Sequence, residues 1–267
     1  MKNILKSGFV FGALTLSALC QACPGVTLIG TSADDTVYTD GGSLGPSTPC
    51  DDVVKSKGGR DIIYVGDGND TVFGGDGNDH IVGGAGNDVI YGERDRDTIY
   101  GGDGDDFLKG GRGDDLIKGE NGDDVLYGGP GNDIIYGGNG QDTIYPGRGN
   151  NVVFPGNGLN ITIVPITSST SITSGDSNGY LVIKGDEPLP EGNGILMDDA
   201  GGVMTVIFES LYITDMTVET AVGSTVFKTL NGQTILTYTT PKIVTMETED
   251  HMREGSVGGL KVIFASD

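Results

Sequence analysis

The sequence predicts an all-β protein in which a parallel β-roll is followed by a small antiparallel β-sandwich. A nine-residue unit of the form Gly-Gly-x-Gly-x-Asp-x-(aliphatic)-x repeats between Val65 and Tyr145, and such a period indicates stacked supersecondary units. Beyond Val164 the repeat stops, and short strand-like runs follow with a hairpin signal at Asn231-Gly232. No segment shows the 3.6-residue apolar period of a helix.

The segment from Met1 to Ala22 has the pattern of a secretory signal peptide. Lys2 and Lys6 precede an apolar stretch from Phe9 to Leu19, and small residues continue to Ala22. The apolar stretch is shorter than the about 20 residues that a membrane-spanning helix needs, so no integral membrane segment is expected. We therefore expect a secreted, extracellular bacterial protein. A lipoprotein signal ending before Cys23 is the alternative that the sequence leaves open.

Removal of this leader would leave two cysteines, Cys23 and Cys50. An even pair in an exported protein predicts a disulfide, here one that tethers a cap over the first coil of the roll. Such a cap would cover an open sheet edge, which is otherwise prone to aggregation.

The roll is expected over residues 23–164. Each unit divides into a six-residue loop closed by Asp and a three-residue strand whose middle residue points inward. Alternate units then stack into two parallel sheets, so that two nonapeptide units make one coil. The predicted inward residues are Val72, Ile81, Ile90, Ile99, Leu108, Ile117, Leu126, Ile135 and Ile144.

Stacked loops bring oxygen atoms together. Loops two units apart lie about 4.8 Å from one another, and glycine allows backbone conformations that turn carbonyl groups into the gap. An all-oxygen cage of this kind suits Ca²⁺. The predicted side-chain ligands are Asp61, Asp70, Asp79, Asp88, Asp97, Asp106, Asp115, Asp124, Asp133 and Asp142. The predicted backbone contributors are Gly75, Gly77, Gly84, Gly86, Gly102, Gly104, Gly111, Gly113, Gly129 and Gly131.

This nonapeptide resembles the RTX, or haemolysin-type, calcium-binding repeat. The resemblance implies a parallel β-roll that takes several calcium ions between its loops. Two departures from the pattern are visible. Glu93 and Asp95 stand where glycine is expected, which predicts a strained or differently liganded loop. Asn151 and Asn160 replace the aspartate, which predicts that metal binding ends while the coil continues.

The charge favours the same ion. The chain carries a net charge of −22, which argues against nucleic acid and anionic membranes as partners. Between Ser56 and Tyr145 there are 19 Asp and Glu against 7 Lys and Arg, so we expect the roll to unfold without calcium and to fold when it binds. A glycine-rich disordered linker is the competing interpretation, but it does not explain the regularly spaced aliphatic residues.

Tyrosines recur at the ninth position and predict outward-facing ladders. Cross-strand packing explains them, although a platform that stacks a ligand is an alternative. They are Tyr91, Tyr100, Tyr127, Tyr136 and Tyr145.

A hinge is expected at residues 165–177 and a β-sandwich at residues 178–267. The sandwich resembles the jelly-roll-like "choice-of-anchor" modules of secreted bacterial surface proteins, through Asp198–Gly202, Leu211–Asp215 and Gly259–Phe264. The alternative function is therefore that of an adhesin, in which the roll is a stalk and this domain binds glycan or a cell-envelope component. The strands are expected at 180–184, 202–208, 211–218, 224–229, 233–239 and 260–265.

No enzymatic activity is expected. Gly175–Gly179 fits Gly-x-Ser-x-Gly around Ser177, with Asp198 and His251 following in hydrolase order. That motif requires a strand before the serine and a helix after it, and neither is predicted here. The other histidine, His80, lies at an outward strand position, where a solvated residue is the default.

Export by a different route also stays open. The apolar-then-acidic end at Lys261–Asp267 resembles the uncleaved C-terminal signal of RTX proteins that leave through a one-step channel. The leader and the cysteine pair favour the general secretory route.

Overall fold

The structure is a computed structural model, and its backbone is described for 13 segments of the chain. They are residues 27–33, 35–38, 50–165, 169–174, 179–184, 195–199, 204–209, 216–221, 224–229, 234–239, 244–249, 252–257 and 260–264. The described residues contain 25 strands and no helix, and they fall into two compact units that divide between Pro130 and Gly131. No described helix is long and apolar enough to cross a membrane.

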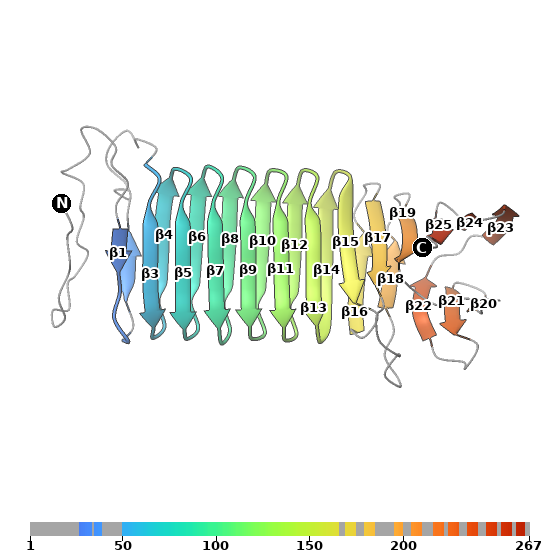
Figure 1. Cartoon of the computed structure of the whole chain (residues 1–267), viewed down its shortest axis with the longest axis horizontal. Helices are drawn as coiled ribbons and strands as arrows, with labels where there is room; N and C mark the ends of the chain where they lie inside the picture. Colours follow the sequence, from blue (N-terminus) through green and yellow to red (C-terminus); the bar gives the residue numbers. More distant parts are fainter. Residues whose placement is uncertain are drawn as a thin grey trace. The chain divides into compact units, whose positions relative to one another are not determined.

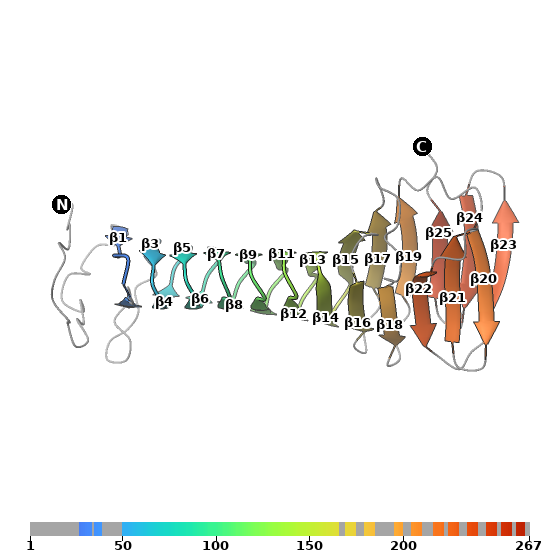
Figure 2. The same ribbon diagram turned by 90° about the horizontal axis from the view of Figure 1, so that it is seen from below.

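The first unit is a parallel β-roll. Odd-numbered strands pair in one sheet in the order β1-β3-β5-β7-β9-β11, and even-numbered strands pair in a second sheet in the order β2-β4-β6-β8-β10. The two rows of strands face each other (Figures 1 and 2). The strands are β1 Thr27–Ile29, β2 Thr36–Tyr38, β3 Val53–Gly58, β4 Ile62–Asp67, β5 Thr71–Asp76, β6 His80–Ala85, β7 Val89–Arg94, β8 Thr98–Asp103, β9 Phe107–Arg112, β10 Leu116–Asn121 and β11 Val125–Pro130.

The register confirms the predicted coil of two nonapeptide units. Val72 pairs with Ile90 across β5 and β7, and Ile81 pairs with Ile99 across β6 and β8. The core is a stack of aliphatic side chains between the two sheets, as the eighth position of each unit predicts. All nine predicted inward residues, from Val72 to Ile144, are fully buried.

The strands are longer than the sequence indicated. From β3 to β11 each strand has six residues because pairing resumes at the second and third positions of the next unit, as between Gly75 and Glu93 and between Asp76 and Arg94. The turn proper is therefore only three residues long and ends at the aspartate. The prediction of a six-residue loop was wrong, since glycine at the second position was taken to interrupt the strand when it stays within the ladder.

The second unit begins with the same architecture. One sheet runs β13-β15-β17-β19-β25-β24-β23 and the other runs β12-β14-β16-β18-β22-β21-β20. The strands are β12 Ile134–Asn139, β13 Thr143–Arg148, β14 Asn150–Asn157, β15 Asn160–Pro165, β16 Ser169–Ser174, β17 Gly179–Lys184, β18 Ile195–Asp199, β19 Met204–Glu209, β20 Met216–Ala221, β21 Ser224–Thr229, β22 Thr234–Thr239, β23 Val244–Glu249, β24 Met252–Val257 and β25 Leu260–Phe264.

The parallel pairing continues beyond the last repeat, but its step grows. Asn160 pairs with Gly179, one residue beyond the two-unit step, and Gly179 pairs with Met204 across a longer stretch of chain. Thr205 then pairs with Lys261, across the longest step of the three. Antiparallel pairing is found, among the described strands, only in β20–β22 and β23–β25, at the end of each sheet.

These strands bear on the predicted C-terminal organisation. Ser169–Ser174, expected to be part of the hinge, forms β16 and pairs with both β14 and β18. The predicted hairpin partners β21 and β22 do pair antiparallel, while the turn at Asn231-Gly232 lies outside the described residues. β18, β23 and β24 were not predicted. A separate sandwich over residues 178–267 stays a prediction.

The signal peptide also stays a prediction, because the segment from Met1 to Ala22 lies outside the described residues. Cys50 is buried, with 5% of its surface exposed. Cys23 lies outside the described residues, so the Cys23–Cys50 disulfide stays a prediction.

Candidate metal-binding loops

The ten predicted aspartates are all buried and occupy the end of each turn. None exposes more than 2% of its surface. In the first unit, the Oδ1 atom of each accepts a hydrogen bond from the backbone N–H of the aspartate one coil earlier: the Asp61 N–H donates to Asp79 at 2.8 Å, and the Asp79 N–H donates to Asp97 at 2.9 Å. In the opposite column, the Asp70 N–H donates to Asp88 Oδ1 at 2.7 Å. The aspartates therefore form two columns, one for each set of alternate units, as the predicted stacking of alternate units requires.

The second carboxylate oxygen sets these residues apart. Among the described residues, the Oδ2 atoms of Asp79, Asp88, Asp97 and Asp106 are buried and accept no hydrogen bond. A buried carboxylate oxygen without a donor is costly, and burial of an ionised group is tolerated only when a counter-charge or a proton compensates it. These atoms therefore mark positions where the folded roll requires a cation or a proton.

The glycine at the first position of each unit forms a cradle beside this oxygen. A Cβ atom built on Gly74 would lie 2.6 Å from Asp79 Oδ2 and 2.9 Å from the carbonyl oxygen of Gly92, one coil later. The same pair of atoms, an aspartate Oδ2 and a carbonyl oxygen from the next coil, surrounds Gly83, Gly92 and Gly101. Two oxygens from two coils thus converge on a space that only glycine leaves open.

This donor set fits Ca²⁺. The atoms that meet at each cradle are carboxylate and carbonyl oxygens, the ligands that a hard cation prefers. Among the described residues, no three His, Cys, Asp or Glu side chains form a cluster. An ion between the coils would therefore take one carboxylate from the aspartate and the rest of its ligands from backbone carbonyls, and it would supply the counter-charge that Oδ2 lacks.

First-position carbonyls are part of these cradles, and sequence reasoning missed them. It singled out the glycines at the second and fourth positions, and all ten of those have a positive φ, for example 114° at Gly75 and 131° at Gly77. The first-position glycines lack a positive φ, so their recurrence through the regular units has another cause. The sequence did contain a signal for these positions, because glycine stands at the first position of every unit from Gly74 to Gly137.

Among the residues that the structure describes, four other than glycine have a positive φ. Glu93 and Asp95 have φ values of 84° and 70°, which confirms the predicted strain in that loop. Lys57 and Glu120 have φ values of 85° and 80°, and the sequence analysis overlooked both. Side chains are disfavoured in this region because Cβ crowds the backbone.

Burial shifts the titration of these carboxyl groups. The pKa of Asp97 and Asp106 is raised to about 8, chiefly by desolvation and in part by neighbouring carboxylates, against the lowering effect of a backbone hydrogen bond. Desolvation likewise raises the pKa of Asp79 and Asp88 to about 6. A metal-free folded roll would therefore hold protons on Asp97 and Asp106 near neutral pH.

An outer ladder of side chains joins the turns at the fifth position, in the opposite direction. The Asn87 N–H donates to Asn69 Oδ1 at 2.8 Å, and the Asp105 N–H donates to Asn87 Oδ1 at 2.9 Å. Buried aspartates thus bind the coil before them, and exposed fifth-position residues bind the coil after them. Each turn is fixed from both sides.

The outward aromatic side chains pack against one another along the sheets. Tyr91 stacks on Phe73 with ring centroids 5.2 Å apart and contacts Phe107 at 5.8 Å. His80 lies between Tyr64 and Tyr100 in edge-to-face contacts at 5.9 and 5.6 Å. These contacts account for the stripe as cross-strand packing, as expected.

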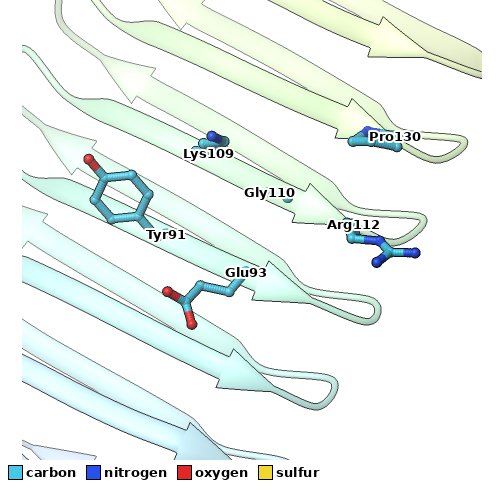
Figure 3. A pocket seen from close by; sticks show the side chains of 7 residues that line it. Tyr91, Glu93, Lys109, Gly110, Arg112 and Pro130 are labelled. Atoms are coloured by element: carbon cyan, nitrogen blue, oxygen red, sulfur yellow. The ribbon is translucent and has the colours of Figure 1, made fainter.

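A shallow pocket of about 310 Å³ lies on the outer face beside the strained loop (Figure 3). Tyr91 and Glu93 of β7 line it on one side, and Lys109 and Arg112 of β9 line it on the other, with Pro130 of β11 at its end. Its charges are mixed, and none of the ten buried aspartates lines it.

Comparison with known proteins identifies the repeat. No curated protein matches the chain. A family model does match, in overlapping segments at residues 51–81, 73–108, 82–117, 100–134 and 118–153. The aspartate columns and glycine cradles lie within these segments up to Asp142. Residues 51–153 of this chain consist of RTX calcium-binding nonapeptide repeats.

Proposed function

We propose that this protein is an extracellular structural module whose β-roll folds on binding several Ca²⁺ ions. The observation that carries the proposal is the set of buried Oδ2 atoms at Asp79, Asp88, Asp97 and Asp106, which accept no hydrogen bond and face glycine cradles. The family match supports calcium as the ion. Extracellular calcium modules commonly bind in the range of about 10⁻⁴ to 10⁻³ M, so the roll would stay unfolded at intracellular calcium and fold after export.

The proposal of secretion is supported by the leader-like segment from Met1 to Ala22 and by the fact that RTX repeat proteins are typically secreted. A role without catalysis rests on the absence of a supported catalytic motif in the sequence. The adhesin alternative, in which the C-terminal part binds glycan or an envelope component, stays a prediction. The side chains that the structure describes end at Ile183, so none beyond that residue supports it.

A calcium titration of the full chain tests the proposal. Isothermal calorimetry should show uptake of several ions, and circular dichroism should show a coil-to-β transition over the same calcium range. The matched control is a titration with Mg²⁺, which demands a compact octahedral site and keeps its water. A β-spectrum that is the same in excess chelator and in millimolar calcium would overturn the proposal that folding depends on the ion.

A further inference from the structure

The N-terminal coils already contain donors for their aspartates. The Thr31 N–H donates to Asp35 Oδ2 at 2.6 Å, and the Ser56 hydroxyl donates to Asp61 Oδ2. Asp35, Asp61 and Asp79 belong to one column, because the Asp35 N–H donates to Asp61 Oδ1 at 2.7 Å and the Asp61 N–H donates to Asp79 Oδ1 at 2.8 Å. In this column, the oxygen that lacks a donor at Asp79 has one in both preceding coils.

Ser56 stands at the first position of its unit, where the regular units have glycine. Its side chain therefore lies in the space that is open at Gly74, and it is fully buried there. Val65, also fully buried, takes the equivalent position in the unit of Asp70. Ser56 and Val65 thus occupy the cradles beside Asp61 and Asp70, whereas Asp35 keeps a glycine, Gly30, at this position.

In the second unit, asparagine replaces aspartate and provides its own donor. Asn151 and Asn160 keep the role of Oδ1, since they accept the backbone N–H groups of Asp133 at 2.9 Å and Asp142 at 2.8 Å. The Nδ2 atom takes the place of Oδ2. It donates to the Gly147 carbonyl at 3.2 Å from Asn151 and to the Pro155 carbonyl at 3.0 Å from Asn160.

This substitution shows what each aspartate lacks. The Asn160 amide donates to the carbonyl of Pro155, the first residue of its own unit, and both groups are buried. At the same point an aspartate would place an oxygen against an oxygen, which is repulsive unless a cation or a proton lies between them. An asparagine amide resolves the contact with a hydrogen bond and no ion.

We propose that hydroxyl and amide groups replace the cation at the N-terminal end of the column that contains Asp61 and at the C-terminal ends of both columns, so that these terminal coils are metal-independent caps. The inference rests on the proposed calcium function and adds which loops take an ion and which do not. An ion between coils takes oxygens from two neighbouring turns and supplies the counter-charge for a buried Oδ2. The hydroxyl and amide donors built into the chain fill this role at the terminal positions without an ion.

Ion counting on the full chain tests the inference. Native mass spectrometry in saturating calcium should find one more ion bound to Ser56→Gly than to the wild type, because the cradle beside Asp61 opens. Ser56→Ala is the matched control: it removes the hydroxyl but leaves a Cβ in the cradle, so its ion count should equal that of the wild type. The reverse change, Gly83→Ser, fills an open cradle at a residue without a positive φ and should remove one ion.

A second pair of variants tests the amide donor independently. In excess chelator, Asp106→Asn should show more β-structure by circular dichroism than the wild type, because it keeps Oδ1 for the Asp88 N–H and gains a donor in place of Oδ2. Asp106→Ala loses both and should show less.

The outcomes separate the two proposals. A wild-type chain that binds no calcium would overturn the proposed function. A wild type that binds calcium, with a folded Ser56→Gly variant of the same ion count, would overturn only the inference about the ends. If Ser56→Gly does not fold, Asp106→Asn decides: β-structure no greater than that of Asp106→Ala overturns the inference.

Discussion

Replacing Glu93 by glycine should stabilise the calcium-bound roll. Glu93 has a φ of 84°, whereas its partners in the register, Gly75 and Gly111, have φ values of 114° and 116°. A left-handed backbone costs a residue with a Cβ about 1–2 kcal/mol. Glycine loses about 0.5–1 kcal/mol more conformational entropy on folding, so the net gain is about 0.5–1 kcal/mol. For a chain of this size, that gain corresponds to a rise in Tm of about 1–4 °C.

The assay is thermal unfolding followed by circular dichroism at one fixed, saturating calcium concentration, since bound ion shifts Tm by mass action. Glu93→Gln is the matched control, because it removes the charge beside Lys109 and Arg112 but keeps the strained backbone; its Tm should stay close to that of the wild type. The reverse substitution, Gly84→Glu, introduces a side chain at a φ of 130° and should lower Tm. A Tm of Glu93→Gly at or below the wild-type value would refute the reasoning.

Three other predictions follow from the core and from the buried carboxyl groups. In chelator, the roll should be more structured at pH 5 than at pH 8. Folding raises the pKa of Asp97 and Asp106 from 3.8 to about 8, so the folded state binds more protons than the unfolded state. The roll therefore loses stability as the pH rises through that range. Equal dichroism spectra at both pH values would contradict it. For the same reason calcium binding near pH 7 should release protons, and the apparent binding enthalpy should then vary with the ionisation enthalpy of the buffer; an invariant enthalpy would count against protonated sites. Leu108→Ala, at a fully buried position, should cost about 2–5 kcal/mol of unfolding free energy in saturating calcium, while Lys109→Ala on the exposed side of the same strand should change it by less than about 0.5 kcal/mol.

The roll was predictable because its period is encoded in single residue types. An aliphatic residue every nine positions fixes the core from Val72 to Ile144, and an aspartate every nine positions fixes both columns. The length of the strands was not predictable in the same way. Glycine at the second position reads as a strand breaker, and only the register shows that Gly75 pairs within the ladder at a positive φ.

The closed ends of the columns were predicted only in part. Asn151 and Asn160 signalled the end of metal binding in the sequence, because they lack the carboxylate charge. Ser56 gave no such signal, since its effect depends on its hydroxyl reaching Asp61, five residues later in the same unit. The C-terminal coils were missed because their period varies. The steps from Asn160 to Gly179 and from Gly179 to Met204 differ in length, so the sequence shows no repeat there, although the strands still pair in parallel.

The opposed hydrogen-bond ladders at the fifth and sixth positions have a consequence for how this chain can change in length. The bonds that join the regular units link residues 18 apart, as between Asp79 and Asp97 and between Asn69 and Asn87, so the coil, and not the nonapeptide, is the unit of length. Removal of residues 83–100 would bring Asp115 to the place of Asp97 and Asp106 to the place of Asp88, with each side chain still on its own sheet. Removal of a single nonapeptide would move every later unit to the opposite sheet and separate neighbours such as His80 and Tyr100. An insertion or deletion of two repeats therefore preserves the alignment of the columns and sheets, whereas an insertion or deletion of one repeat disrupts it.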